Sequence, residues 1–296
     1  KGDLDFISGL DASYKDQLLT RTGALKMQYR DKIGMETCPY LNTEYLGILM
    51  DTTAAVMRAN PLRDIRIRKA INQSFDRKKM ISFLRNGIGT PGIYGMVPPG
   101  LPSFDTTVTG YTYNPEAVQA LLADAGYPGG KGLPEILMST TKEYQDLCEF
   151  MQGQLAESGI KIKLEVNQGA THREMVAKQQ LAFFRGSWIA DYPDAENYLS
   201  LFYSPNKAPA GPDYTHFSNA TFDSLYNRAG KTVNDSIRYE YYKEMDRLVI
   251  ENAPVVVLYY DQVIRLYGKN IEGLGRNGMN LLTLKRVQKK NTIQTP

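Results

Sequence analysis

Residues 135–166 read EILMSTTKEYQDLCEFMQGQLAESGIKIKLEV, and this stretch decides the fold class. Its first four residues are mostly apolar, and its last seven alternate between apolar and polar, as strands do. Between them, residues 142–158 carry apolar residues such as Leu147 and Leu155 at helical spacing, and Gly159 stops the helix. A strand, a helix and a second strand in this order predict an α/β domain with a partly parallel sheet.

Amphipathic helices are expected on both sides of this unit. Helix starts are indicated by Asn60-Pro61, Asp76 and Asn114-Pro115, because a capping side chain stands before the first helical residue. In the first of these helices, the basic residues are expected on the solvent side; they are Arg63, Arg66, Arg68 and Lys69. Further helices are expected over residues 223–229 and 236–252, followed by an apolar strand over residues 254–260. Residues 87–104 are rich in Gly and Pro, which predicts a long ordered loop.

Composition is that of an ordinary water-soluble globular protein. The 296 residues are 42% hydrophobic and 23% charged, and a chain of this length forms one or two lobes. The net charge is +3 with both signs interspersed, which gives no case for nucleic acid or an anionic membrane as a partner. Tyrosine is abundant, with 20 copies, and its ring with a polar tip suits a pocket that accepts varied side chains.

Cysteine and histidine usage excludes a zinc-finger type of site. Cys38 and Cys148 are far apart in the sequence and form no CxxC pair. The sequence does not decide whether they form one disulfide. His172 and His216 are too few to complete a zinc site with them. No apolar run approaches the roughly 20 residues that span a bilayer. The chain starts at Lys1 without an initiator Met, so we expect a fragment of a longer protein.

The candidate site lies in Phe184-Arg185-Gly186-Ser187-Trp188-Ile189-Ala190-Asp191-Tyr192-Pro193-Asp194. The only Trp stands three residues before a carboxylate and three residues after an arginine. An apolar run, residues 181–184, precedes the motif and predicts a short buried strand that gives way to a loop here. Cation, indole and anion so placed could hold a zwitterion, since charge-assisted hydrogen bonds are worth roughly 1.5–3 kcal/mol. The alternative is a core Trp beside two surface charges.

Several motifs in one order resemble a known family. They are Gly2-Asp3-Leu4-Asp5, Asp64-Ile65-Arg66-Ile67-Arg68-Lys69-Ala70-Ile71-Asn72 with Asp76-Arg77, Gly89-Thr90-Pro91-Gly92 with Pro98-Pro99, Tyr113-Asn114-Pro115-Glu116-Ala117 with residues 121–127, Trp188-Ile189-Ala190-Asp191-Tyr192-Pro193-Asp194, Phe222-Asp223-Ser224-Leu225, and Ala253-Pro254-Val255-Val256-Val257-Leu258-Tyr259. Together they resemble the extracellular solute-binding proteins of the oligopeptide- and dipeptide-binding type, which feed ABC transporters.

The resemblance implies an α/β fold of the periplasmic-binding-protein type (type II, cluster C). Members are roughly twice as long as this chain, so we expect the carboxy-terminal lobe with parts of the second lobe. Residues 1–46 would be a remnant of the amino-terminal lobe with the hinge, residues 47–257 the α/β ligand-binding lobe, and residues 258–296 a return segment. The hinge strands would lie near Thr43–Met50 and Val255–Tyr260.

The resemblance also implies roles for the candidate residues. Asp191 would pair with the ammonium of a peptide ligand, Arg185 with its carboxylate, and Trp188 would form a pocket wall. Ala190 and Tyr192, which flank Asp191, and Tyr214 complete the expected ligand-binding set. No catalytic residue, metal or cofactor is expected.

The partners that the resemblance implies are a peptide and the permease subunits of an ABC transporter. The protein would be a periplasmic or extracellular, membrane-associated monomer, with a lipid anchor on the full-length form.

Two other functions stay open at this point. A binding protein of this fold could carry a non-peptide cargo such as nickel, haem or a sugar, because fold does not fix the ligand. An α/β hydrolase is disfavoured, because the sequence contains no Gly-x-Ser-x-Gly elbow, phosphate loop or dinucleotide fingerprint.

Overall fold

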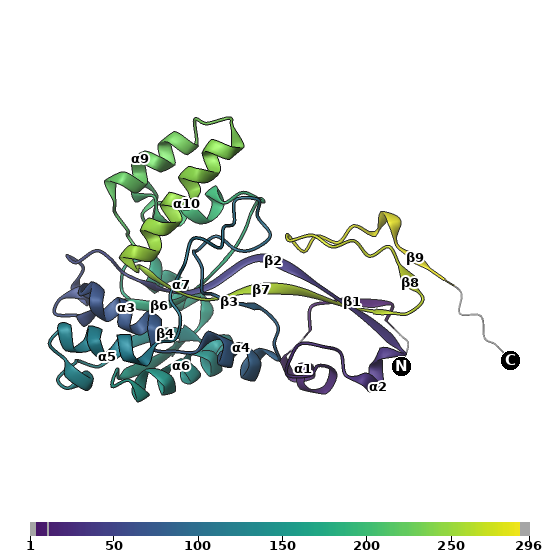
Figure 1. Ribbon diagram of the computed structural model, residues 1–296, viewed down its shortest axis with the longest axis horizontal. Helices are drawn as coiled ribbons and strands as arrows, with labels where there is room; N and C mark the ends of the chain where they lie inside the picture. The colour runs from purple at the N-terminus through teal and green to yellow at the C-terminus, as the bar shows by residue number, and fades with distance from the viewer. Residues whose placement is uncertain (1–3, 11, 291–296) are drawn as a thin grey trace.

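The computed structural model describes residues 4–10 and 12–290 and shows a lobe from which a long arm extends (Figure 1). Two antiparallel strands, β2 (Ile33–Ile48) and β7 (Val255–Gly268), run from the lobe through the arm. These strands include Thr43–Ile48 of the first expected hinge segment and all of the second, Val255–Tyr260, and both extend farther into the arm than the sequence suggested. Their outer halves are covered by short elements: β1 (Phe6–Ser8), α1 (Ala12–Leu18), α2 (Met27–Arg30), β8 (Ile271–Glu272) and β9 (Gln288–Lys289).

The main sheet has the strand order β1-β7-β2-β6-β4-β5, and β3 (Thr90–Pro91) also pairs with β7. Strands β4 (Ile136–Thr141) and β5 (Ile162–Asn167) are parallel and are joined by α6 (Gln145–Glu157). The predicted β-α-β unit and the α/β class are thus confirmed. Strand β6 (Phe183–Ile189) pairs parallel with β4 and antiparallel with β2, which links this unit to the long strands.

Helices cover both faces of the sheet (Figure 1). On one face lie α3 (Ile65–Gln73), α4 (Arg77–Arg85), α5 (Pro115–Asp124) and α6; on the other lie α9 (Ala220–Ala229) and α10 (Asp235–Asn252). The apolar strand β7 serves both layers, because its side chains alternate: Val256 and Leu258 join the first core, and Val255 and Val257 join the second. The remaining helices are α7 (Gly169–Ala177) and α8 (Glu196–Leu199), with short 3-10 turns at Ala55–Met57, Pro61–Arg63, Pro128–Gly130, Lys142–Tyr144, Ser200–Phe202, Ser204–Asn206 and Leu284–Arg286.

The helix caps largely follow the sequence, and one basic residue does not. Asp76 and Asn114 accept hydrogen bonds from the third residue of α4 and α5, as predicted. Asn60 caps only the turn Pro61–Arg63, and Asp64 caps α3. Arg68 was expected in solvent but is 6% exposed, because its guanidinium donates to the carbonyls of Leu62, Arg63 and Asn252.

The predicted long loop is present and is pinned to α10. Buried Asp246 accepts hydrogen bonds from the backbone N–H groups of Met96 (2.7 Å) and Val97 (3.3 Å). Tyr260 donates to the carbonyl of Gly95 at 2.5 Å. Position 95 requires glycine, since a Cβ there would lie 1.8 Å from Asp246 Oδ2. Apolar contacts order the loop as well, because Met96, Val97 and Leu101 are buried in the core that α10 also lines.

Two findings bear on the remaining expectations. Cys38 and Cys148 are both free, so the disulfide left open by the sequence does not form. Within residues 4–10 and 12–290, no helix combines the length and the apolar character needed to cross a bilayer. Lys1, Gly2, Asp3 and Pro296 lie outside the described part. The division into residues 1–46, 47–257 and 258–296 stays a prediction.

Candidate functional site

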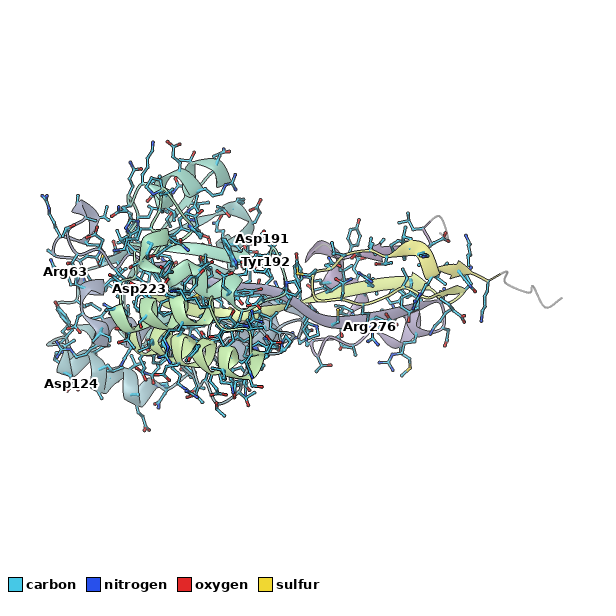
Figure 2. The ribbon with its side chains drawn as sticks, turned by 90° about the horizontal axis from the view of Figure 1, so that it is seen from above. Arg63, Asp124, Asp191, Tyr192, Asp223 and Arg276 are labelled. Atoms are coloured by element: carbon cyan, nitrogen blue, oxygen red, sulfur yellow. The ribbon has the colours of Figure 1, made fainter. Side chains whose placement is uncertain are left out.

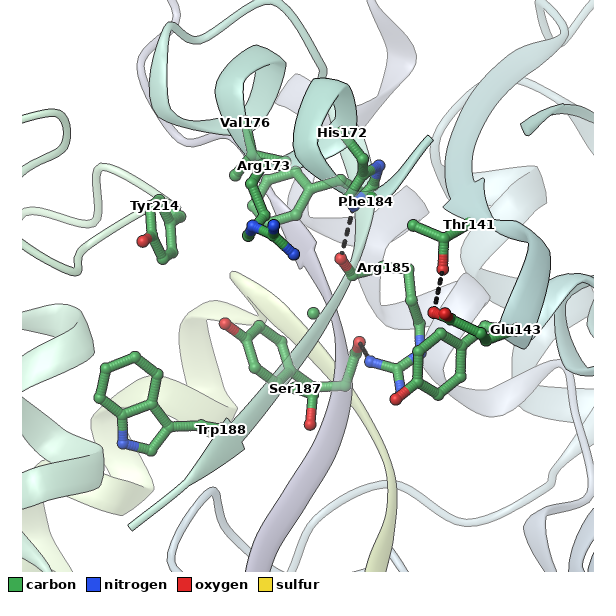
Figure 3. A pocket seen from close by; sticks show the side chains of 14 residues that line it. Thr141, Glu143, His172, Arg173, Val176, Phe184, Arg185, Ser187, Trp188 and Tyr214 are labelled. Carbon is green, nitrogen blue, oxygen red and sulfur yellow. Dashed lines mark hydrogen bonds between the residues drawn. The ribbon is translucent and has the colours of Figure 1, made fainter. Parts of the chain in front are cut away.

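A pocket of about 440 Å³ opens beside β6 on the lobe (Figure 3). Strand β6 forms its floor, α7 forms one wall, and the turn Lys142–Tyr144 before α6 forms another. Its residues are mostly aromatic or charged: Tyr45, Thr141, Glu143, Tyr144, Gly169, His172, Arg173, Val176, Phe184, Arg185, Gly186, Ser187, Trp188 and Tyr214. Three of the residues predicted from the sequence, Arg185, Trp188 and Tyr214, therefore line one pocket.

The strand that carries the motif is longer than expected. The sequence predicted a strand that ends near Phe184, but β6 continues to Ile189 because β2 pairs with it residue by residue, from Asn42 opposite Ile189 to Ile48 opposite Phe183. Arg185 and Trp188 are consequently strand residues, on opposite faces of the sheet, and only Asp191 follows the strand end.

Arg185 is already paired inside the lobe. Its guanidinium forms an ion pair with Glu44, and the two side chains are 2% and 4% exposed. It also donates to the carbonyl of Tyr45 at 3.2 Å and stacks on the ring of Tyr144, 3.8 Å from the ring centroid. Asn42 donates to the other oxygen of Glu44 at 2.9 Å. This geometry corrects the expectation that Arg185 meets a ligand carboxylate, and it also differs from the alternative of a surface charge: the guanidinium is committed to Glu44 inside the lobe.

Burial sets the acid–base character of this pair. Desolvation lowers the pKa of Arg185 to about 10, so the guanidinium stays charged at neutral pH. A buried charge of this kind is tolerable only with a partner and full hydrogen bonding. The sequence signal for the partner was Glu44 itself, an acid directly before the apolar run Tyr45-Leu46-Gly47-Ile48.

Trp188 and Asp191 are held by one residue that the sequence analysis missed. Buried Asn197, on α8, accepts hydrogen bonds from Trp188 Nε1 (2.8 Å) and from the backbone N–H of Asp191 (3.2 Å). Its amide donates to Asp191 Oδ2 at 3.5 Å. The carboxylate of Asp191 remains exposed, and Figure 2 shows Asp191 and Tyr192 on the side of the lobe that adjoins the arm. Indole and carboxylate are thus fixed relative to each other, while the carboxylate stays open to an incoming group.

The remaining predicted residues have distinct environments. Ala190 is 3% exposed, its N–H donates to the carbonyl of Leu41, and it does not line the pocket. Tyr192 is 45% exposed, and its hydroxyl donates to Glu196. Partial desolvation of the hydroxyl, followed by this hydrogen bond, raises the pKa of Tyr192 to about 12. Asp194 accepts from the N–H of Glu196 at 2.9 Å and forms an ion pair with Arg238 at 3.0 Å.

Two further pocket residues were not singled out by the sequence. His172 is buried, and both ring nitrogens are engaged, with Ser139 Oγ at 3.1 Å and the carbonyl of Arg185 at 2.9 Å. Arg173, the next residue on α7, is exposed and points toward the pocket (Figure 3). A helix that lines a pocket carries such residues at positions that sequence spacing alone does not reveal.

Comparisons with known proteins agree with this architecture. Residues 1–210 match the family model "Bacterial extracellular solute-binding proteins, family 5 Middle". The chain is 22% identical over 252 residues to the dipeptide-binding protein of Escherichia coli (strain K12), covering 84% of this chain and 46% of that protein. It is 26% identical over 233 residues to heme-binding protein A of Haemophilus influenzae, covering 77% and 41%. It is 27% identical over 219 residues to glutathione-binding protein GsiB of Salmonella typhi, covering 72% and 42%.

Solved structures show the same fold. HbpA2 from Haemophilus parasuis superposes with a TM-score of 0.82 at 20% identity, covering 98% of this chain and 54% of that one. The periplasmic binding protein DppA from Helicobacter pylori, in complex with peptide STSA, gives 0.79 at 19% identity, covering 98% and 53%. The chain spans about half the length of these relatives. By its sequence and its fold, the chain belongs to the family 5 bacterial extracellular solute-binding proteins.

Proposed function

We propose that this chain carries the ligand-binding lobe of the substrate-binding component of an ABC importer, and that the ligand is a short peptide. One observation carries the proposal: the exposed carboxylate of Asp191 lies next to the indole of Trp188, and Asn197 fixes both. A fixed, accessible carboxylate is the group that recognises an ammonium, and a flat apolar ring beside it adds contact area without selecting one side chain.

Asp191 does not itself line the pocket beside Trp188, and the residues that do line it are consistent with a ligand of varied side chains. Tyr45, Tyr144, Phe184, Trp188 and Tyr214 supply aromatic walls, and an aromatic lining with few polar groups is typical of sites for small ligands. In this proposal the ligand sits between the lobe and a second lobe, and the long strands β2 and β7 serve as the hinge between them. The protein would act outside the cytoplasmic membrane, as a monomer that delivers its ligand to permease subunits, with a lipid anchor on the full-length form.

A non-peptide cargo is the second candidate, because one relative is named heme-binding protein A. The pocket does not favour haem ligation by histidine: His172 is the histidine among the lining residues, and both of its nitrogens are occupied. Mass spectrometry of small molecules that copurify with the full-length protein would identify the cargo.

The test of the anchor is calorimetric titration of the full-length protein with Ala-Ala-Ala and with its N-acetylated form. Replacing Asp191 by Asn should weaken binding of the free peptide at least ten-fold, about 1.4 kcal/mol. The variant should no longer distinguish the two peptides, because N-acetylation removes the charge that Asp191 meets.

Asp124→Asn is the matched control, since Asp124 is an exposed carboxylate at the far end of the lobe from Asp191 (Figure 2). It should bind both peptides as the wild-type protein does. Unchanged affinity of Asp191→Asn for the free peptide would refute the anchor role.

A further inference from the structure

The two long strands lose their regular pairing at one point between the lobe and the arm. The ladder of the arm ends with Pro39 of β2 opposite Gln262 of β7, and the ladder of the lobe begins with Thr43 opposite Tyr260. The β2 residues between these two pairs therefore face a single residue of β7, Asp261. A bulge of this kind interrupts the ladder and lets the strands bend. The arm can turn relative to the lobe at this point.

An ion pair spans the bulge. Arg85, in the last turn of α4, donates from Nη2 to Asp261 Oδ1 at 2.5 Å, and the two side chains are 16% and 21% exposed. The same carboxylate oxygen accepts from the backbone N–H of Gln262, where the arm begins, at 2.8 Å. The guanidinium of Arg85 also donates to the hydroxyl of Tyr259 at 2.8 Å and lies 4.1 Å from the centroid of that ring. Asp261 thus joins a helix of the lobe to the start of the arm.

The residues that follow α4 make further contacts with the arm. Asn86 Nδ2 donates to Asp16 Oδ1 on α1 at 2.8 Å, and α1 adjoins α4 where the arm leaves the lobe (Figure 1). The N–H of Gly89 donates to the side-chain oxygen of Gln262 at 3.3 Å. Ile88 is 3% exposed and packs in an apolar cluster of the arm. The buried arm residues of this cluster are Leu19, Leu25, Ile264 and Leu266.

We propose that residues 85–89, which we call the clasp, set the equilibrium between the orientations of the arm and the lobe, and that the Arg85–Asp261 ion pair is the contact that is released when the arm turns. A bulged pair of strands bends at low cost, so side-chain contacts across the bulge decide which angle is favoured. Ile88 is seated among apolar residues of the arm, whereas the ion pair lies partly in water, so its charges regain solvent when they separate. The ion pair is therefore the part of the clasp that breaks first.

This inference rests on the proposed function, in which β2 and β7 form the hinge, and it names how ligand capture is regulated. A ligand binds the orientation that completes its site, so its apparent dissociation constant varies inversely with the population of that orientation. The clasp also adjoins the pocket. Burial raises the pKa of Tyr144, a pocket residue, and the charges of Glu143 and Asp261 add to this shift. The clasp thus lies within electrostatic reach of the site whose affinity it tunes.

The experiment measures the orientation of the arm directly, by double electron–electron resonance between two spin labels on the ligand-free, full-length protein. Asp124→Cys and Arg276→Cys provide the label sites, one at the far end of the lobe and one on the arm (Figure 2). Cys38→Ser removes the half-buried thiol that would also take a label, and Cys148 is 0% exposed. The main distance of the otherwise unchanged protein should be that of the orientation with the clasp formed.

Asp261→Asn and Arg85→Gln should each raise the ratio of other distances to this main distance at least five-fold, about 1 kcal/mol. The double variant should do no more than either single one, because the two residues form one contact. Asp64→Asn is the matched control: it removes the charge from the pair with Arg66 at 2.6 Å, which lies wholly in the lobe, and should leave the ratio unchanged.

Asp16→Ala tests the clasp at a second contact. Asp16 is exposed, so its loss leaves the core of the arm intact, and the ratio should rise about two-fold. Folded Asp261→Asn and Arg85→Gln variants with a ratio less than two-fold above the unchanged protein overturn the inference, as does an equal rise in Asp64→Asn. Should both fail to fold, an unchanged ratio in Asp16→Ala overturns it. Because the labels report without ligand, a protein that binds no peptide would refute the proposed function and leave this inference standing.

Discussion

Replacing Glu44 by Gln should destabilise the lobe strongly, because it leaves Arg185 charged, buried and unpaired. The substitution is conservative in shape and retains the oxygen that accepts from Asn42. The Arg185 and Glu44 side chains are 2% and 4% exposed, so solvent cannot replace the lost partner. Removing one member of a buried pair costs roughly 3–5 kcal/mol. At about 2–4 °C per kcal/mol for a domain of this size, the melting temperature should fall by about 6–20 °C.

The double variant Glu44→Gln with Arg185→Met separates charge from packing. The methionine keeps an apolar stem beside Tyr144 and removes the cation, so the neutral amide at position 44, which still accepts from Asn42, no longer stands beside a buried unpaired charge. We therefore expect its free energy of unfolding to return to within about 2 kcal/mol of wild type. Urea unfolding followed by far-UV circular dichroism, with Trp188 fluorescence as a second probe, gives both values.

The result also tests the assignment of the ligand's cation. If Glu44→Gln lowers the free energy of unfolding by less than about 1 kcal/mol, the effect is that of an exposed ion pair. That result would refute the reasoning that Arg185 is committed to Glu44. If the wild-type protein prefers N-acetyl-Ala-Ala to its C-terminal amide and the double variant does not, Arg185 serves the ligand's carboxylate, the role that the resemblance implied. If the double variant keeps the wild-type ratio of the two affinities, Arg185 is a structural residue of the sheet.

Two further predictions concern the pocket wall and the anchored loop. Gly186→Ala would place a Cβ 2.5 Å from the buried ring of Tyr45, so we expect the free energy of unfolding in urea to fall by about 1–3 kcal/mol and ligand binding to weaken. Gly153→Ala in α6 is the control, because a Cβ there meets no neighbouring side chain within 4 Å; its free energy of unfolding should rise by up to about 1 kcal/mol. Burial raises the pKa of Asp246 from 3.8 to about 7, so at pH 4–7 the folded state binds this proton more tightly than the unfolded state. The stabilisation that protonated Asp246 contributes is therefore complete below about pH 4 and is lost as the pH rises toward 7. Asp246→Asn should therefore reduce the fall of the melting temperature between pH 4 and 7. The fall should not vanish, because the pKa of Asp213 is also raised to about 7. An unchanged dependence of the melting temperature on pH would contradict this account.

Much of the fold was predictable because its signals are local in the sequence. The β-α-β unit followed from the period of apolar residues, and the caps of α4 and α5 followed from Asp76 and Asn114. The order of motifs indicated the family. The spacing from Trp188 to Asp191 also selected two residues that the structure fixes together.

The extent of β6 was beyond these signals. Arg185 and Gly186 interrupt the apolar pattern, so the sequence predicted a loop, but pairing with β2 continues the strand through both. Strand length is decided by the hydrogen-bonding partner along the whole edge, and here that partner is more than a hundred residues away in the chain.

The sequence by itself determined the fold class, the helix boundaries near Asp76 and Asn114, and the carboxylate that stands three residues after the only Trp. Only the tertiary structure decided the state of the Arg185 charge, because it paired Arg185 with Glu44, 141 residues away. The physical reason is that helical period and capping depend on neighbouring residues. The state of a charge depends on which distant segments surround it, and that follows from how the sheet assembles.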